Sequence, residues 1–318
     1  MAKNIFLSRL LPEAGMELLK QSEFNVDIHW DDDPLPPEVF RKRVRNVNGL
    51  ICLLDDIINF ELIDAAPQLE VISNTAVGFN NIDINYAKSK GIAVCNTPEI
   101  LTQTTAELAW ALLFAIARRI PESDTFMRNG KFTGWKPLLM LGGNIQGKTL
   151  GVIGAGRIGT AFALMSKGFN MRVLYSGKSN PVLDFELNAE NVDLQILLRE
   201  SDFVSLHVPF RDSNYHLIGK DELALMKQTA YLINTARGSV VDEMALITTL
   251  QEKRIAGAGL DVYEHEPALS PGLTELENVV LTPHTGSATI ETRDTLAVMA
   301  VENCLNILRG KNCENRVV

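Results

Sequence analysis

Three polar residues with complementary chemistry stand out in the second half of the chain: Arg237, Glu266 and His284. Each follows an apolar segment typical of a buried strand, and in an open parallel sheet the groups after such strands share the rim where ligands bind. Hydride delivery to a carbonyl builds negative charge on oxygen, and a histidine with a carboxylate partner can stay protonated to neutralise it. An arginine can hold a substrate carboxylate through two parallel hydrogen bonds. The set therefore suits the reduction of a 2-oxo acid.

Each of these residues also has an ordinary explanation. An arginine at a strand end is more often part of a surface ion pair, a glutamate before a proline is more often a solvated loop residue, and a loop histidine is more often structural. Glu264, two residues before Glu266, is a second candidate for the carboxylate. The joint occurrence of the three types with a glycine-rich turn favours the catalytic interpretation.

That turn has the spacing Gly154-x-Gly156-x-x-Gly159, directly after the apolar segment 149–153 and at the start of a helical pattern. In this context Gly154 allows a tight turn, Gly156 lets backbone amides approach a pyrophosphate, and Gly159 lets helix and strand pack closely. The helix N-terminus adds partial positive charge for the anion. An ordinary turn between strand and helix is the alternative, but strand, turn and helix together favour dinucleotide binding.

The choice of nicotinamide cofactor depends on the residues after the next strand, 171–175. A site that prefers NAD places a carboxylate about 20 residues beyond the turn, where it binds the ribose 2′-hydroxyl. Here Ser176 and Lys178 follow the strand, and the first carboxylate is Asp184. Ser176 and Ser179 can donate hydrogen bonds and Lys178 adds positive charge, so we predict that NADPH is preferred and NADH is possible. In the alternative, Ser176 binds the 2′-hydroxyl and the protein is NAD-dependent or dual.

Two series of strands and helices are predicted to position these residues, which indicates an α/β fold with doubly wound parallel sheets. Strand patterns lie at 4–7, 25–29, 49–53, 70–73, 92–95, 149–153, 171–175, 203–206, 230–234, 257–260 and 279–281. Helical patterns lie at 12–20, 37–43, 61–65, 83–90, 98–120, 122–129, 154–168, 194–199, 220–226, 241–253 and 287–308.

The longest apolar run lies inside the helical pattern 98–120, for which Thr97 is the expected N-cap and Pro121 the stop. The run covers residues 108–117 and is apolar on nearly all sides, which predicts burial between domains or subunits. It is too short to span a bilayer. A loop at 131–147, rich in glycine, separates the two series.

Composition limits the function without defining it. A chain of 318 residues is long enough for two domains, and its 46% hydrophobic and 22% charged residues are typical of soluble globular proteins. A net charge of −9 argues against a general nucleic-acid binder. The four cysteines are scattered and without metal spacing, and the N-terminus has no export signal, so we expect reduced thiols in a cytoplasmic protein and no membrane segment.

Taken together, these motifs make the chain resemble the D-isomer-specific 2-hydroxyacid dehydrogenases, and among them the glyoxylate/hydroxypyruvate reductases. The resemblance covers nearly the whole chain. It implies two Rossmann-like domains, with a cofactor domain (99–286) inserted into a substrate domain (1–98 and 287–318). The matching stretches are VGFNNID (77–83), NTPEILTQTTAELAWALL (96–113), GKTLGVIGAGRIG (147–159), HVPFRDSNYHLIG (207–219), INTARGSVVDE (233–243), AGLDVYEHEP (258–267) and LTPHTGSAT (281–289).

The resemblance also implies roles for individual residues. Arg237 becomes the substrate-binding arginine, Glu266 the partner of the histidine, and His284 the proton donor, which makes Glu264 the lesser candidate. Backbone amides at Val77 and Gly78 would meet the substrate carboxylate. The residues implied at the cofactor are Arg157 and Ile158 on the pyrophosphate, Asp261 near the nicotinamide carboxamide, and Thr105, His207, Pro209, Thr235, Ala236 and Gly286 along the cleft.

Trp135 lies in the loop before the first cofactor-binding strand. In reductases of this kind a tryptophan there can reach the partner subunit's site, so the resemblance implies substrate contact by Trp135 and a homodimer built around residues 98–141. An exposed aromatic in a mobile loop is the alternative.

Other members of this group stay open as alternatives. Phosphoglycerate and phosphonate dehydrogenases share the layout, although only residues 310–318 follow the last helical pattern here. Formate dehydrogenases are expected to have Gln where Glu266 stands. A cofactor-sensing binding protein, like the C-terminal-binding co-repressors, could also retain the three polar residues. Asn80 and the segment 210–212 depart from the family's usual residues and leave substrate preference open.

Overall fold

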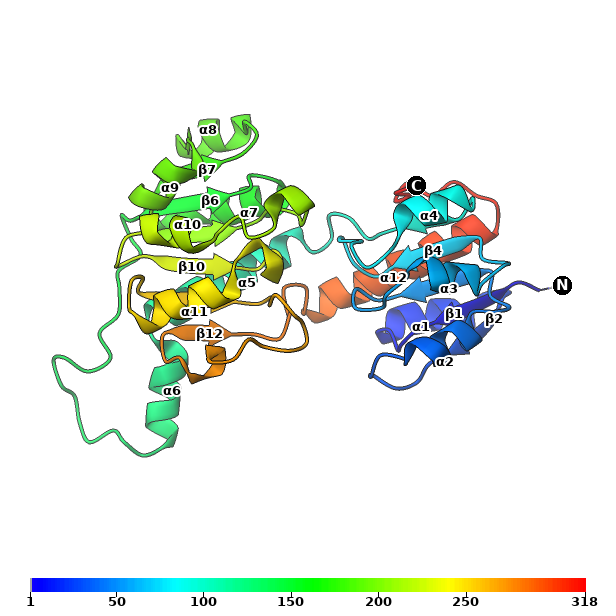
Figure 1. Cartoon of the computed structure of the whole chain (residues 1–318), viewed down its shortest axis with the longest axis horizontal. Coiled ribbons are helices and arrows are strands. Elements are labelled where there is room, and N and C mark those ends of the chain that lie inside the picture. Colours follow the sequence, from blue (N-terminus) through cyan, green and yellow to red (C-terminus); the bar gives the residue numbers. More distant parts are fainter. Residues whose placement is uncertain (1) are drawn as a thin grey trace. The chain divides into compact units, whose positions relative to one another are not determined.

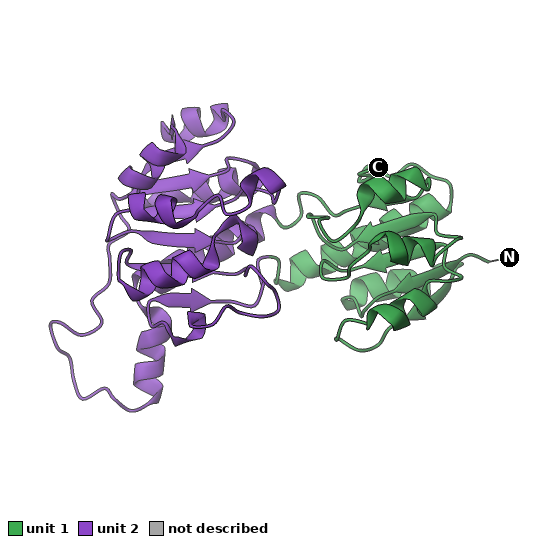
Figure 2. Ribbon diagram, in the orientation of Figure 1, with its two compact units in different colours: residues 1–101, 287–318 green, residues 102–286 purple. Residues whose placement is uncertain are grey.

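The structure is a computed structural model that describes residues 2–318. It contains two compact units, coloured separately in Figure 2. Unit 1 combines residues 1–101 with 287–318, and unit 2 consists of residues 102–286. The chain therefore leaves the first unit, builds the second, and returns.

Unit 1 is built on a five-stranded parallel sheet with the strand order β2-β1-β3-β4-β5. Helices α1 and α12 cover one face, and α2, α3 and α4 lie along the other. The strands are β1 (Asn4–Leu7), β2 (Asn25–Ile28), β3 (Gly49–Cys52), β4 (Val71–Asn74) and β5 (Ala93–Cys95). The helices are α1 (Glu13–Lys20), α2 (Pro37–Arg43), α3 (Phe60–Asp64), α4 (Ile84–Ser89) and α12 (Ile290–Leu308).

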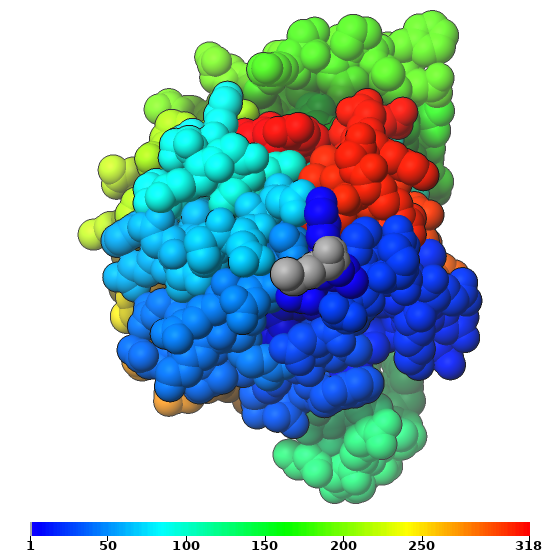
Figure 3. Space-filling model, turned by 90° about the vertical axis from the view of Figure 1, so that its right-hand side faces the viewer, coloured from blue at the N-terminus to red at the C-terminus, as the bar shows by residue number. Residues whose placement is uncertain are grey.

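The C-terminal segment completes unit 1. After α12 it turns back and pairs antiparallel with the edge strand β5, through a hydrogen bond from Val317 N to Val94 O of 2.7 Å and a bridge between Cys95 and Arg316. Figure 3 shows this red segment on the outer surface beside the cyan part of the chain. Both ends of the chain thus belong to the same unit, because α12 packs on β3, β4 and β5.

Unit 2 is built on a seven-stranded parallel sheet with the order β12-β11-β10-β9-β6-β7-β8, so the order reverses between β6 and β9. Such a reversal opens a crevice at the carboxyl ends of the strands, where ligands bind in this class of sheet. The strands are β6 (Thr149–Ile153), β7 (Arg172–Ser176), β8 (Glu190–Asn191), β9 (Phe203–Leu206), β10 (Tyr231–Asn234), β11 (Gly257–Leu260) and β12 (Val279–Leu281).

Helices cover both faces of the second sheet as well. Helix α5 packs on β10, β11 and β12 beside α7, while α9, α10 and α11 form the opposite layer (Figure 1). The helices are α5 (Thr102–Ala117), α6 (Ile120–Arg128), α7 (Arg157–Met165), α8 (Pro181–Leu187), α9 (Leu194–Glu200), α10 (Lys220–Leu225) and α11 (Glu243–Gln251). The predicted α/β class with two parallel sheets is confirmed.

The prediction for the start of the long helix was wrong. Helix α5 begins at Thr102, because Glu99 has a left-handed φ of 72° and the Thr97 N–H donates to the Ala76 carbonyl instead of opening a helix. Thr97 is fully buried and acts as part of the loop after β5. The sheet of unit 2 and α7 bury helix α5, which explains why the helix is apolar on nearly all sides. Near Pro98, tertiary packing overrides the local propensity for a helix start.

Two short elements, α8 and β8, were not predicted. Strand β8 has only two residues, Glu190 and Asn191, and both are exposed, so it carries no apolar signal. Helix α8 starts from Asn180, whose side chain accepts hydrogen bonds from the Val182 and Leu183 N–H groups. The Asn-Pro pair at its start was the available signal, because asparagine at the N-cap followed by proline is typical of a helix N-terminus.

Helix α6 and the loop that follows it stand off from the rest of unit 2 as an arm (Figure 1). The arm, residues 120–141, exposes several large apolar side chains to solvent. Its exposed apolar side chains are Ile120, Met127, Phe132, Trp135, Leu138 and Leu141.

Candidate active site

The carboxyl ends of β10, β11 and β12 bring three of the predicted site residues onto one rim of unit 2. His284 and Glu266 are hydrogen-bonded, with 2.8 Å between Nδ1 and Oε2. The other carboxylate oxygen of Glu266 accepts the Tyr263 N–H at 2.9 Å, which orients the group toward the histidine. Burial raises the pKa of Glu266, but the hydrogen bond and charge of His284 lower it further, so the pKa lies below its ordinary value. The glutamate is therefore an anion at neutral pH.

Arg237 provides a cation without a carboxylate partner. Its Nη1 donates to the Ala236 carbonyl at 2.7 Å, and within residues 2–318 the guanidinium forms no ion pair at salt-bridge distance. Burial lowers the pKa of Arg237, and the nearby Glu266 carboxylate partly opposes this. A desolvated guanidinium with free donors is suited to hold an anion by two parallel hydrogen bonds.

Asp261 organises the loop that carries His284. It is buried, and its carboxylate accepts hydrogen bonds from the Thr282 hydroxyl (2.6 Å), the Thr285 N–H (2.7 Å) and the Gly286 N–H (2.8 Å). His284 itself has a left-handed φ of 52° and donates its N–H to the Asp261 carbonyl. Sequence reasoning missed this supporting role. The signal was a lone aspartate ending an otherwise apolar strand, since such a buried carboxylate needs donors close by.

The backbone geometry of the glycine-rich turn explains its glycines at positions 154 and 159. Gly154 has a left-handed φ of 96°, and a Cβ there would lie 2.8 Å from the His207 carbonyl carbon. A Cβ on Gly159 would lie 2.1 Å from the Gly154 oxygen, whereas Gly156 faces open space. The turn after β6 thus touches the loop after β9, at the point where the strand order reverses. Arg157 and Ile158 begin α7 directly behind the turn.

The surrounding side chains fit a dinucleotide. Thr235 is buried and its hydroxyl has no partner among the described residues, which leaves a donor for a bound group. Burial lowers the pKa of His207 to about 3, so its imidazole is neutral, and its Nε2 lies 2.9 Å from the Ser205 hydroxyl. The Thr105 hydroxyl donates to the Gly286 carbonyl at 3.1 Å and ties α5 to this edge. Of the remaining predicted residues, Ala236 is half-buried on the same rim and Pro209 is exposed in the loop after β9.

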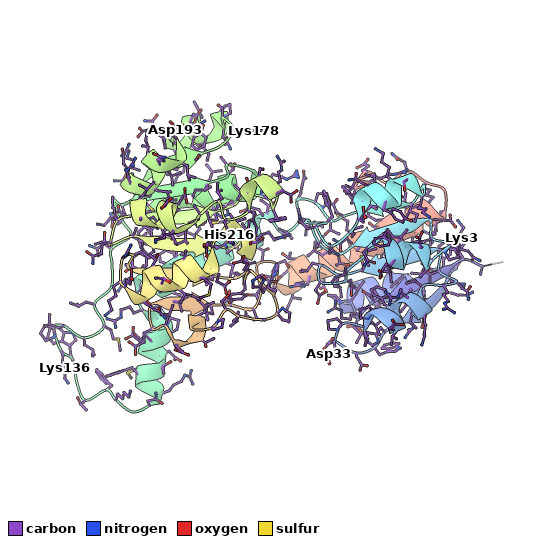
Figure 4. The ribbon with its side chains drawn as sticks, viewed as in Figure 1. Lys3, Asp33, Lys136, Lys178, Asp193 and His216 are labelled. Atoms are coloured by element: carbon purple, nitrogen blue, oxygen red, sulfur yellow. The ribbon has the colours of Figure 1, made fainter. Side chains whose placement is uncertain are left out.

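The end of β7 presents no free carboxylate. Ser176 is half-buried, and Lys178 is exposed at the outer end of the unit (Figure 4). Asp184, the first acidic residue after β7, accepts a hydrogen bond from the Tyr175 hydroxyl at 2.7 Å. Asn180 fixes the segment to the glycine-rich turn, donating to the Ala155 carbonyl at 3.0 Å. This environment is compatible with a phosphate group.

In unit 1 the loop after β4 carries Val77 and Gly78. Their carbonyls accept hydrogen bonds from the side chains of Asn96 and Asn74, each at 2.8 Å. Asn81 extends this scaffold by donating to the Leu53 carbonyl at 3.0 Å. With the carbonyls fixed, the N–H groups of Val77 and Gly78 have no partner within residues 2–318 and are available to an anion. The asparagines that build the loop were not predicted as site residues.

The arm carries Trp135, whose side chain is 82% exposed. Lys136, labelled in Figure 4, lies beside it in the outermost part of the loop. The rest of unit 2 leaves the indole largely uncovered, so it is available for contacts from outside this unit.

Comparison with known proteins and the geometry of the site indicate the same class of enzyme. The family model for the D-isomer specific 2-hydroxyacid dehydrogenase NAD binding domain matches residues 110–286. A glyoxylate reductase from Thermococcus litoralis is 46% identical over 100% of this chain and 97% of its own length. A crystal structure of a Thermus thermophilus protein has a TM-score of 0.93 at 41% identity, covering 99% of this chain and 100% of that chain. An NADPH-dependent glyoxylate/hydroxypyruvate reductase from Sinorhizobium meliloti, solved with NADP and malonate, has a TM-score of 0.87 at 30% identity, covering 100% and 97%.

The fold and the site define a nicotinamide-dependent oxidoreductase that interconverts 2-oxo and 2-hydroxy acids. The chain belongs to the D-isomer specific 2-hydroxyacid dehydrogenase family. Its cofactor is a nicotinamide dinucleotide, and its substrate is a small molecule. No helix between residues 2 and 318 is both long and apolar enough to cross a membrane. The same residues contain no group of three or more His, Cys, Asp or Glu side chains that could hold a metal ion.

Proposed function

We propose that this protein reduces glyoxylate, hydroxypyruvate or a similarly small 2-oxo acid to the D-2-hydroxy acid, with NADPH as the preferred reductant. One observation carries the proposal: the unpaired guanidinium of Arg237 lies on the same rim as the hydrogen-bonded pair of His284 and Glu266. An anion-binding cation beside a supported proton donor is what the carboxylate and the carbonyl of such an acid require.

In the proposed mechanism, Arg237 binds the substrate carboxylate and polarises the neighbouring carbonyl. His284 donates a proton to the carbonyl oxygen as negative charge develops there, while Glu266 stabilises the imidazolium before transfer and holds its orientation. A bound nicotinamide supplies the hydride. Unit 2 is proposed as the cofactor domain and unit 1 as the substrate domain, in which the free N–H groups of Val77 and Gly78 are proposed to bind substrate.

A panel of 2-oxo acids tests the proposal. Purified protein is mixed with NADPH and, in separate assays, glyoxylate, hydroxypyruvate, pyruvate, 2-ketogluconate and phosphohydroxypyruvate, and oxidation of the cofactor is followed by its absorbance. We expect the highest kcat/KM with glyoxylate or hydroxypyruvate. Highest activity with phosphohydroxypyruvate would favour a phosphoglycerate-type enzyme, and no turnover of any acid would favour a cofactor-sensing binding protein.

Cofactor preference gives a separate prediction. The wild-type protein should have a higher kcat/KM with NADPH than with NADH, because the end of β7 has Ser176 and Lys178 and its nearest carboxylate, Asp184, is already engaged. Ser176→Asp should reverse this, lowering kcat/KM for NADPH about 10- to 100-fold through repulsion of the 2′-phosphate, while NADH is retained. Steady-state kinetics with both cofactors measure the ratio. A wild type that prefers NADH contradicts the prediction.

The exposed arm is proposed to mediate a homodimer, in which Trp135 contacts the substrate bound by the partner subunit. Removing the arm's six large apolar side chains from water would favour the association of two copies. The four free, buried cysteines further suit a reducing compartment, and we propose the cytoplasm.

Trp135→Ala tests this contact. It should raise KM for the oxo acid about 5- to 30-fold while leaving KM for NADPH unchanged, because a buried indole contributes roughly 1–2 kcal/mol to a ligand contact. Sedimentation equilibrium of both proteins establishes whether the dimer persists. Trp30→Ala, which removes an exposed tryptophan outside the arm, is the matched control, and an unchanged KM for the oxo acid in the Trp135 variant counts against the proposed contact.

A further inference from the structure

The proposed site depends on two loops that the chain makes separately. One follows β10 and carries Arg237, and the other follows β11 and carries Glu266. Their spacing must be held closely, since a misplacement of about 1 Å in a catalytic group can lower a rate by two orders of magnitude. A residue other than Arg237, Glu266 and His284 that contacts both loops would help to hold this spacing.

His216 touches both loops. Its backbone N–H donates to the Ser239 carbonyl at 2.9 Å, in the turn directly after Arg237. Its imidazole Nε2 lies 2.7 Å from Oε1 of Glu264, two residues before Glu266. His216 also has a left-handed φ of 50°, a backbone conformation that few residues other than glycine adopt. The labelled side chain lies within unit 2 in Figure 4.

The contact with Glu264 belongs to a larger hydrogen-bonded network. The Tyr215 ring stacks on the imidazole with 3.9 Å between centroids, and its hydroxyl donates to the same Glu264 oxygen at 3.1 Å. Glu264 N–H donates to Oε2 of the buried Glu243 at 2.9 Å, and Oε1 of Glu243 accepts the Ser270 N–H at 3.0 Å. Such a network restrains the loop, because several hydrogen bonds hold the Glu264 segment at once.

The charges around the imidazole favour this arrangement. The Glu264 side chain is only 9% exposed, and Asp242 lies on the opposite side of the ring, with 3.9 Å between its Oδ2 and Nδ1 of His216. Burial raises the pKa of Glu264, but hydrogen bonds from His216 and the Glu243 region lower it more, so its pKa lies below the ordinary value. The carboxylate is thus ionised and fully able to accept hydrogen bonds.

Backbone packing completes the connection between the two loops. A Cβ on Gly238 would lie 1.8 Å from the Tyr263 carbonyl carbon, so the turn after Arg237 rests directly on the loop after β11. Tyr263 in turn donates its N–H to Glu266 at 2.9 Å. A displacement of Glu264 is therefore transmitted to Glu266 through two residues of backbone.

We propose that His216 is a positioning residue that clamps the loop of Arg237 to the loop of Glu266. The kinetic consequence rests on the proposed reduction of a 2-oxo acid, whereas the clamp itself does not. The Glu264 carboxylate, which competes with Glu266 as a catalytic candidate on sequence grounds, has this supporting role instead. His216 acts through its neighbours and does not itself contact the reacting atoms.

His216→Asn tests the clamp in the full-length protein. Asparagine tolerates the left-handed backbone better than other non-glycine residues, so the backbone bond to Ser239 is kept while the imidazole is lost. Hydrogen–deuterium exchange should become faster in segments 238–243 and 262–270 and stay unchanged in 149–176. His265→Asn, on an exposed side chain of the same loop, is the matched control.

The kinetic test separates positioning from stability. In His216→Asn we expect kcat/KM for the oxo acid to fall about 10- to 100-fold, with a higher KM for the acid, an unchanged KM for NADPH and a larger isotope effect with deuterated NADPH. Glu264→Gln should change the same quantities in the same direction. A variant that only melts earlier, with KM and isotope effect as in wild type, overturns the proposal, as does unchanged exchange in both loops. If the wild type turns over no oxo acid, the proposed function fails, while the exchange experiment still decides the clamp.

Discussion

His284→Ala should lower kcat for reduction of the oxo acid by about 10²–10⁴-fold, the range that a positioned general acid contributes. The physical reason is that negative charge on the carbonyl oxygen is then left without a proton donor as hydride arrives. KM for NADPH should change little, because the imidazole is directed to Glu266 and not to the glycine-rich turn. Steady-state kinetics at saturating NADPH measure the effect.

Two variants make this result specific. His265→Ala removes an exposed imidazole 19 positions earlier and should leave kcat within about twofold. Glu266→Gln keeps the shape of the carboxylate but removes its charge, and it should lower kcat less than His284→Ala does. The double variant Glu266→Gln/His284→Ala should be no slower than His284→Ala alone, because the glutamate acts through the histidine. A near-normal kcat in His284→Ala would refute the assignment.

Arg237→Ala is expected to act mainly on substrate binding. Charge-assisted hydrogen bonds contribute about 1.5–3 kcal/mol each, so losing two of them should lower kcat/KM for the oxo acid about 10²–10⁴-fold, with most of the change in KM. Some loss in kcat should accompany it, because the guanidinium also polarises the carbonyl. KM values are obtained from initial rates over a wide range of acid concentration.

The matched variants of Arg237 test geometry against charge. Arg237→Lys keeps the positive charge but loses the planar fork, so its kcat/KM should fall between those of wild type and Arg237→Ala. Arg254→Ala removes an exposed arginine that pairs with Glu252, and it should leave both parameters unchanged. Equal KM values in wild type and Arg237→Ala would show that another group binds the substrate carboxylate.

Local sequence patterns were sufficient for most elements of the fold. The strand predictions at 203–206, 257–260 and 279–281 are confirmed to the residue, because short, mainly apolar segments are local signals. The glycine-rich turn is equally local, since backbone conformation and close approach demand glycine at particular positions. Where local propensity competed with long-range packing, as at Thr97 and Pro98, the sequence prediction was wrong.

The sequence by itself determined which chemical groups the protein has and that parallel strands would deliver them to one rim, because residue type and strand periodicity are properties of neighbouring positions. Tertiary structure alone decided the pairing. It brought Glu266, and not Glu264, to 2.8 Å from His284, directed Asp261 into the loop of that histidine, and left Arg237 without an ion-pair partner among residues 2–318. These contacts join residues 18 to 25 positions apart, and their geometry depends on how three strands end and how three loops pack.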